Sequence, residues 1–273
     1  MLFRLTLAYD GTAYRGWQVQ PEGPTIQAVL EEALERLCGE RVRLRVAGRT
    51  DAGVHAAAQV AAFRCPKGWE PEILRRALDA LTPPDIVVRR VSTAPEDFDP
   101  RKDALSRVYL YRIWNAPVPN VFLRRFAWHV REPLDTEAMG RAAEHLLGEH
   151  DFSSFRAAGC TARHAVRRVL RSSVERKGSQ VVYTIEATGF VRHMVRNVVG
   201  ALVEVGSGRK EPAWIAAVLR ARDRTRAART APAHGLCLWE VRYPSEAQDD
   251  PETEAVVESL VGHASEPDGT EGE

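Results

Sequence analysis

The sequence predicts an α+β protein made of two ferredoxin-like halves, each with the split β-α-β order of strands and helices. Patterns in the first ~90 residues alternate in the order β-α-β, β-α-β. The segment 107–115 then resembles the segment 3–10, so the second half begins as the first does. We expect the halves to be related by a weak pseudo-repeat, with their sheets joined across a central basic cleft.

Apolar spacing and end signals define the elements of the first half. Thr25 is the expected N-cap of one amphipathic helix, and Pro71 is the expected first residue of another. The Asp10-Gly11 pair ends the first strand as a turn. The expected elements are strands over 3–9, 42–46, 57–63 and 86–91 and helices over 26–37 and 71–81.

The second half follows a polar connection at 97–101. Asp135 is expected to cap a helix, and the apolar periodicity of 190–205 predicts a long, deeply buried helix. We interpret 148–155 as a turn that carries two aromatic residues. The other expected elements are strands over 107–115, 165–174, 181–187 and 236–241 and a short helix from Pro212.

Charge is segregated along the chain. The net charge is +1, but residues 244–273 contain ten acidic residues and neither Lys nor Arg, which leaves +11 on residues 1–243. A basic body favours an acidic partner, and 34 of the 38 basic residues are arginines, whose flat fork suits phosphate. We divide the chain into halves 1–103 and 104–243 and a tail 244–273, which has too little apolar surface to order itself.

Several classes of protein do not fit the sequence. The four cysteines are far apart without a C-x-x-C pair, so we expect reduced, mostly buried thiols. The N-terminus lacks the features of a signal peptide, and the chain has no apolar run of about 18 residues that would span a membrane. We expect a cytoplasmic protein without a membrane segment. The spacing of His, Cys and acidic residues predicts no metal site.

Residues 47–56, with the sequence Ala-Gly-Arg-Thr-Asp-Ala-Gly-Val-His-Ala, are the stretch around which the chain is organised. Two glycines bracket Asp51, and they allow backbone and ligand to approach closely on a turn between strands. Taken alone, the stretch is more readily explained as an ordinary turn in which Arg49 pairs with Asp51, because Asp and Gly are common in turns. We assign His55 to the loop, because no chemistry requires it.

Two residues far along the chain are candidates to complete a site with Asp51. Arg196 lies on the otherwise apolar helix, where a buried guanidinium needs a partner, and Asp51 is the acid that we pair with it. The alternative is an exposed helix face with Arg196 in water. Tyr109 and Tyr111 share one face of a strand, where Tyr109 either packs in the core or stacks on a nucleobase.

Taken together, the chain resembles the tRNA pseudouridine synthase A family over essentially residues 1–243. The segments that carry the resemblance are Tyr9-Asp10-Gly11, Gly16-Trp17-Gln18, Gly48–Ala56, Tyr109-Leu110-Tyr111, Gly148–Phe155, Phe190–Gly200 and Gly235-Leu236. The resemblance implies isomerisation of uridine to pseudouridine at positions 38, 39 and 40 in the anticodon stem-loop of tRNA. It also implies a homodimer whose subunits bind one tRNA jointly, and no cofactor or metal.

The roles of individual residues are implied by this resemblance. Asp51 matches the family's catalytic aspartate, and Arg196 matches the arginine that pairs with it. Tyr109 matches the tyrosine that stacks on the uracil and assists proton removal from C5. Arg49 matches an arginine that helps to hold the flipped nucleotide, and Leu236 matches an apolar residue that lines the uracil pocket.

The implied reaction breaks the N1–C1′ bond and joins C5 to C1′, without redox change or group transfer, so it needs no cofactor. An ionised Asp51 attacks carbon, stabilises an oxocarbenium ion or assists deprotonation of the sugar, and the sequence leaves these paths open. The stacked target base must first be flipped out, at a cost of a few kcal/mol. Two rival readings are a hydrolase that releases uracil and an RNA-binding module without catalysis. Val108 stands where the family often has arginine.

Overall fold

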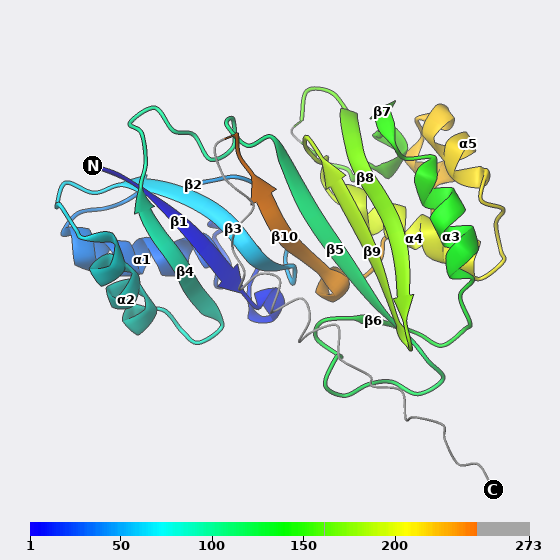
Figure 1. Ribbon diagram of the computed structural model, residues 1–273, viewed down its shortest axis with the longest axis horizontal. Coiled ribbons are helices and arrows are strands. Elements are labelled where there is room, and N and C mark those ends of the chain that lie inside the picture. The colour runs from blue at the N-terminus through cyan, green and yellow to red at the C-terminus, as the bar shows by residue number, and fades with distance from the viewer. Residues whose placement is uncertain (161, 245–273) are drawn as a thin grey trace, which may run out of the picture.

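A computed structural model describes residues 1–160 and 162–244. In these residues ten strands form one mixed sheet in the order β4-β1-β3-β10-β5-β9-β8-β7, with β2 beside β3 and β6 beside β5 (Figure 1). The acidic tail predicted from residue 244 lies outside the described residues from Ser245 onward. In the part of the chain that is described, no helix is long and apolar enough to cross a membrane.

The elements of the first half follow the predicted order. They are β1 (Leu2–Tyr9), α1 (Ile26–Cys38), β2 (Arg45–Val46), β3 (His55–Arg64), α2 (Pro71–Leu81) and β4 (Ile86–Thr93). The strand order β4-β1-β3-β2 is antiparallel throughout. Both predicted helix starts are confirmed, because the Thr25 side chain accepts from the N–H of Ala28 and Pro71 is the first residue of α2.

The strand predicted over 42–46 is shorter than expected. Its burial alternates as the sequence indicates, with Val42 and Leu44 buried and Arg43 exposed. Only β2 pairs with β3, however, and the N–H of Leu44 donates to the carboxylate of Glu31 instead of to a neighbouring strand. A side chain of α1 therefore replaces the backbone partner that would extend this strand.

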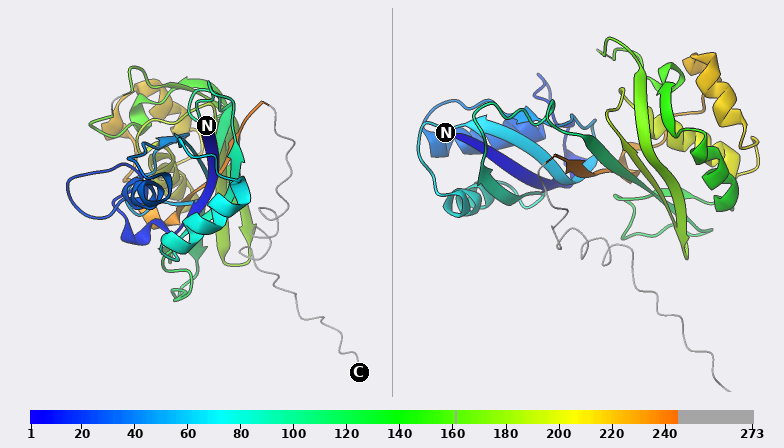
Figure 2. Two further views of the ribbon diagram at one scale, coloured as in Figure 1. Left: turned by 90° about the vertical axis from the view of Figure 1, so that its left-hand side faces the viewer. Right: turned by 45° about the horizontal axis from the view of Figure 1, so that its top comes forward.

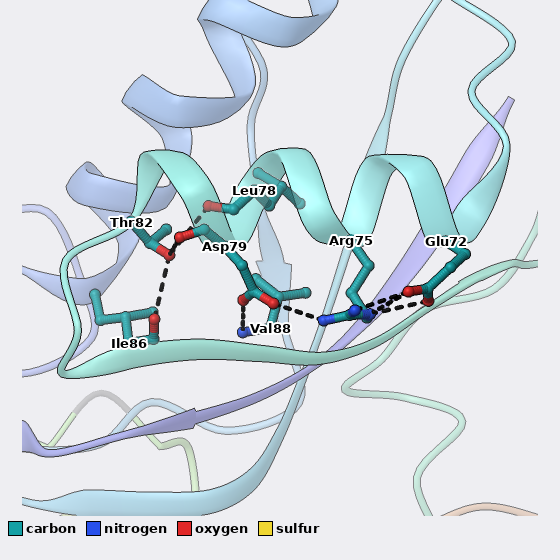
Figure 3. A network of polar contacts seen from close by, with 7 residues as sticks. All are labelled: Glu72, Arg75, Leu78, Asp79, Thr82, Ile86 and Val88. Atoms are coloured by element: carbon teal, nitrogen blue, oxygen red, sulfur yellow. Dashed lines mark hydrogen bonds and ion pairs between the residues drawn. The ribbon is translucent and has the colours of Figure 1, made fainter.

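Helix α2 is fastened to the edge strand β4 by polar contacts at its C-terminal half (Figure 3). The carboxylate of Asp79 accepts from the N–H of Val88 at 2.9 Å and from Arg75 at 2.6 Å. The Thr82 hydroxyl lies 3.1 Å from the carbonyl oxygen of Leu78 and 3.2 Å from that of Ile86. These bonds satisfy backbone groups on both sides of the turn between the two elements.

The second half contains β5 (Ser106–Asn115), β6 (Trp128–Val130), α3 (Thr136–Glu144), β7 (Gly148–Asp151), β8 (Val166–Lys177), β9 (Gln180–Ala187), α4 (Met194–Gly206), α5 (Trp214–Ala221) and β10 (Leu236–Arg242). The strand order β10-β5-β9-β8 is antiparallel throughout. The Asp135 carboxylate caps α3 by accepting from the N–H of Ala138, as predicted.

Two predictions for the second half were wrong in detail. The segment 148–155 is not only a turn, because β7 pairs with β8 before a 3-10 turn at Ser153–Phe155. Helix α4 begins at Met194 rather than near Phe190. The reason is local, since His193 has a φ of 61°, in the left-handed region, and a right-handed helix cannot run through it.

The two halves form one continuous sheet rather than two sheets that face each other. Strand β10 of the second half pairs in parallel with β3 of the first, at Cys237 with His55 and at Leu238 with Ala56. Helices gather in two groups, α1 and α2 with the N-terminal strands and α3, α4 and α5 with the C-terminal strands (Figures 1 and 2).

The main hydrophobic core lies on the side of the sheet that carries Tyr109 and Leu236. In α4, every residue except Arg196 and Glu204 is buried, as the predicted deep helix requires. The four cysteines are unpaired, and all but Cys160 are buried, which confirms the expected free thiols.

Candidate active site

Residues 48–54 form the loop that carries Asp51 into β3. The N–H of Val54 donates to the carbonyl of Asp51 at 3.1 Å, which closes a tight turn over 51–54. Gly53, the third residue of this turn, has a φ of 74°, a conformation that glycine adopts without steric cost. The turn that presents the carboxylate therefore requires glycine at position 53.

The aromatic segment 14–18 supports the Asp51 loop from behind. The N–H of Trp17 donates to the carbonyl of Thr50 at 3.0 Å, and a Cβ on Gly16 would lie only 2.6 Å from that same oxygen. The buried hydroxyl of Thr50 lies 2.8 Å from the hydroxyl of Tyr9. These contacts fix the backbone and the side chain of Thr50, directly before Asp51.

Asp51 and Arg196 lie next to each other. Arg196 Nη1 lies 3.9 Å from Asp51 Oδ2, and the side chains are 16% and 32% exposed respectively, so the carboxylate is partly buried and still open to solvent. Arg196 Nε donates to the carbonyl of Ala231 at 2.8 Å, which fixes the plane of the guanidinium. Burial lowers the pKa of Arg196, and the negative charge of Asp51 opposes that shift.

His193 is a second neighbour of Asp51 that the sequence reasoning missed. Its Nε2 lies 3.5 Å from Asp51 Oδ2. The sequence signal was present, because His193 precedes Arg196 by three residues, about one helical turn. The helix predicted from Phe190 placed this histidine within the helix instead of at its N-cap.

Tyr109 lies on β5 with its ring buried, and the ring meets Phe190 edge to face with centroids 4.9 Å apart. Burial raises the pKa of Tyr109, and Tyr9 and Asp51 raise it further, so the hydroxyl is protonated at neutral pH. A Cβ on Gly48 would lie 4.0 Å from this hydroxyl, so the Asp51 loop borders it. Tyr109 therefore offers a neutral hydroxyl beside the carboxylate.

Leu236 and Arg49, the other two predicted site residues, do not contact Asp51 through a hydrogen bond or ion pair among the described residues. Leu236 is buried at the start of β10 and is paired with Tyr111, on the sheet face that also carries Tyr109. Arg49 is exposed, and within residues 1–160 and 162–244 its side chain makes no hydrogen bond or ion pair. The structure thus brings Arg196 to Asp51 and places Tyr109 at the border of the same loop, whereas among the described residues no ion pair joins Arg49 to Asp51.

His55 is not the loop residue that we predicted, because it is the first, buried residue of β3. The N–H of Gly11 donates to its Nδ1 at 3.1 Å, and its Nε2 faces the carbonyl oxygens of Arg125 at 2.9 Å and His234 at 3.2 Å. Asp10 Oδ1 also lies 3.1 Å from Nδ1. Burial lowers the pKa of His55, and the negative charge of Asp10 opposes that shift. His55 joins the end of the Asp51 loop to both halves.

Asn197 connects α4 to the segment that holds Arg196. It is fully buried, and its amide donates to the carbonyl of Phe155 at 2.8 Å. Its Oδ1 accepts from the hydroxyl of Thr230 at 2.6 Å and from Arg224 at 3.1 Å. These bonds hold segment 224–230 against α4, directly before the Ala231 carbonyl that receives Arg196.

The chemistry available at this site is that of a single carboxylate. A carboxylate beside a cation and a protonated hydroxyl can act as nucleophile or stabilise a developing positive charge. Among the described residues, no cluster of three or more His, Cys, Asp or Glu is arranged to hold a metal ion. Asp51 lines neither of two surface hollows, one of about 750 Å³ beside Trp214 and one of about 230 Å³ beside Trp128. The Asp51 side chain is 32% exposed, so the carboxylate is open to solvent.

Comparison with known proteins gives consistent matches. The family model described as "tRNA pseudouridine synthase" matches residues 6–101 and 142–244. A protein of Myxococcus xanthus named tRNA pseudouridine synthase A is 51% identical over 241 residues, which cover 88% of this chain and 91% of that protein. The protein of the same name from Pelobacter propionicus is 49% identical and is covered to 98% of its length, with 88% of this chain matched.

A solved structure described as "Structure of H/ACA RNP bound to a substrate RNA containing 2'-deoxyuridine" matches with a TM-score of 0.35 and 14% identity. The match covers 74% of this chain and 44% of that chain.

Proposed function

The chain belongs to the tRNA pseudouridine synthase family, and we propose that it isomerises uridine to pseudouridine at positions 38, 39 and 40 of the anticodon stem-loop of tRNA. Asp51 is the essential carboxylate in this proposal. The observation that carries it is the meeting of Asp51 with Arg196 at 3.9 Å beside the protonated Tyr109, on a loop built to keep the carboxylate accessible.

Each residue of the site has a separate role in the proposed reaction. Arg196 stabilises the ionised form of Asp51 and aims it, because its own guanidinium is held by the Ala231 carbonyl. The ring of Tyr109 stacks on the uracil, and its hydroxyl assists removal of the C5 proton. Leu236 lines the pocket on the same sheet face. Arg49 is exposed and unpaired among the described residues, so its guanidinium is available to a phosphate of the flipped nucleotide.

The atoms balance within the substrate. The bond from N1 to C1′ breaks, the uracil turns while it is held in the site, and C5 bonds to C1′. The proton lost from C5 is matched by the proton gained at N1, so the product has the same mass as the substrate. Asp51 supplies negative charge at the stage at which the sugar becomes electron-poor.

We further propose that the chain consists of an N-terminal half, 1–103, and a C-terminal half, 104–243, related by a pseudo-repeat. The support is the shared strand order, β4-β1-β3-β2 in one half and β10-β5-β9-β8 in the other, both antiparallel. Asp51 comes from the first half and Tyr109 and Arg196 from the second. We propose a basic cleft at this junction, a homodimer that binds one tRNA jointly, and a cytoplasmic location.

The test is removal of the carboxylate. Asp51→Ala and Asp51→Asn should abolish tritium release from C5-labelled tRNA, while tRNA binding and melting temperature stay near the wild-type values. Asp97→Ala, which removes an exposed acid elsewhere in the first half, is the matched control and should keep full activity. Turnover by either Asp51 variant contradicts the proposed role.

The same assay separates the rival readings. A hydrolase would release free uracil from the tRNA, and a binding module would release neither uracil nor tritium. Mapping pseudouridine in the product tests the proposed positions. Pseudouridine elsewhere in the tRNA, with none at 38, 39 or 40, would overturn the proposed substrate site and leave the isomerase assignment intact.

A further inference from the structure

The N-terminus of α4 brings two side chains to the same oxygen of Asp51. His193 Nε2 lies 3.5 Å from Oδ2, and Arg196 Nη1 lies 3.9 Å from that same atom. Both side chains therefore make their shortest contact with the same carboxylate oxygen. Because a carboxylate has two oxygens, this arrangement distinguishes them: the shortest contacts from both side chains are made to Oδ2.

The backbone of His193 is not explained by the stability of the helix. It has φ 61° and ψ 9°, and although it is the N-cap residue, its side chain makes no capping bond. A left-handed conformation at a residue other than glycine costs of order 1 kcal/mol or more, and Ser, Thr, Asp or Asn would cap the helix better. What this conformation does achieve is to direct the imidazole toward Asp51.

The imidazole of His193 is suited to donate to a carboxylate without being charged. Burial is the main cause that lowers its pKa. The charge of Asp51 opposes this shift, and Arg196, Arg192 and Arg224 reinforce it. At neutral pH the ring is therefore neutral, with one N–H to donate. A separation of 3.5 Å in the ligand-free protein is of the kind that tightens when substrate binds.

We propose that His193 is a positioning residue which, together with Arg196, fixes Oδ2 of Asp51 and so presents Oδ1 to the flipped nucleotide. The inference rests on the proposed role of Asp51. His193 itself touches no reacting atom in this arrangement. It acts by restricting rotation of the carboxylate, so its loss should slow turnover without weakening the binding of tRNA.

Three substitutions separate positioning from a structural role. His193→Gly removes the imidazole and relieves the backbone strain, because glycine adopts a positive φ freely. His193→Asn also tolerates this conformation and caps helices well, but its amide nitrogen reaches only to the place of Nδ1. His193→Gln is the least favourable of the three for the backbone, yet its amide nitrogen reaches to the place of Nε2.

The two readouts should rank the variants in opposite orders. We expect the Gly and Asn variants to melt at or above the temperature of wild type, and the Gln variant to have the lowest melting temperature of the three. We expect kcat to fall by about 10- to 100-fold in the Gly and Asn variants, because a misplaced catalytic group loses this much. The Gln variant should recover at least about tenfold of that loss by restoring a donor at the right reach. KM for tRNA should stay within about twofold of wild type.

Measurement of melting, kcat and KM on the full chain decides the matter, with Asp51→Ala beside the three variants. If kcat follows the order of melting temperature, or if KM rather than kcat changes, the positioning role is wrong. If all three variants turn over as wild type while Asp51→Ala is inactive, this inference fails and the proposed function stands. If Asp51→Ala is active, the proposed function fails, and this inference fails with it.

Discussion

Single buried side chains hold the Asp51 loop by satisfying backbone groups from several segments. His55 accepts from Gly11 and faces the carbonyl oxygens of Arg125 and His234, so one ring connects three pieces of chain. Buried polar groups are costly unless paired, so a residue with this many partners stabilises the fold around the site. His55 therefore supports the structure around the candidate site.

This role predicts a pH dependence of stability. The pKa of His55 in the folded protein lies below its unfolded value of 6.5, so below pH 6.5 the unfolded state binds more protons. The stabilising contribution of neutral His55 is complete above pH 6.5 and is lost as the pH falls. His55→Gln has no titrating ring, and its amide reaches to the place of Nε2 rather than to that of Nδ1, which accepts from Gly11. The substitution should therefore cost about 1–3 kcal/mol at pH 7.5.

Urea unfolding of wild type and His55→Gln at pH 7.5 and at pH 5.5 measures this effect. The difference in the free energy of unfolding between the two proteins should shrink at the lower pH. His193 and His234 also have pKa values lowered by burial, and both proteins share them, so their contribution cancels in the difference. A difference that is equal at both pH values would contradict the prediction.

At the scale of elements, α4 is the part of the molecule on which the site depends most. It carries Arg196 on its first turn and packs against the segment 229–231, whose Ala231 bonds to Arg196 through both backbone groups. The close approach is possible because residue 200 is glycine. A Cβ there would overlap the carbonyl oxygen of Arg229, a backbone atom that cannot yield by rotating a side chain.

Gly200→Ala should therefore displace the segment 229–231 and disturb Arg196. We expect a loss of about 1–3 kcal/mol in the free energy of unfolding, as for other overpacked cores, together with a fall in kcat. Gly140→Ala is the matched control, because nothing lies within 4 Å of its added Cβ in helix α3. It should stabilise by about 0.5–1 kcal/mol and leave kcat unchanged. Equal effects of the two substitutions on unfolding would refute the packing argument.

At the scale of the whole molecule, charge is divided between a basic body and an acidic segment at the end of the chain. Residues 1–243 carry +11, and residues 244–273 carry ten acidic side chains. An RNA substrate and these acids are both negatively charged, so both should be attracted to the basic residues of 1–243, to which the acids are covalently attached. Like charges also repel RNA directly, so the acidic residues should weaken binding at low salt.

Truncation after Pro244 should tighten tRNA binding by about threefold or more at an ionic strength of ~0.05 M. This gain in affinity should vanish near ~0.5 M, because exposed charges are then screened. A full-length variant with the ten acids replaced by Asn and Gln separates charge from chain length and should behave as the truncation does. Filter binding across a salt series measures the affinity of the intact protein, the truncated protein and the Asn/Gln variant for tRNA. Identical affinities of truncated and intact protein at low salt would show that the acids do not act on RNA.

Local structure was largely predictable from the sequence because it depends on local chemistry. The caps at Thr25 and Asp135, the start at Pro71 and the turn around Asp51 follow from backbone preferences that a few neighbouring residues fix. Boundaries at the strand 42–46 and at the start of α4 were misplaced where a distant partner or a left-handed residue overrode periodicity.

By itself, the sequence determined the order of the elements, the basic character of residues 1–243 and a glycine-bounded turn that exposes one carboxylate. Only the tertiary structure decided that β3 and β10 join the halves into one sheet, that Arg196 and His193 approach the same oxygen of Asp51, and that Arg49 does not. The physical reason is that periodicity and capping act over a few residues, whereas these contacts depend on how α4 packs on a sheet assembled from both ends of the chain.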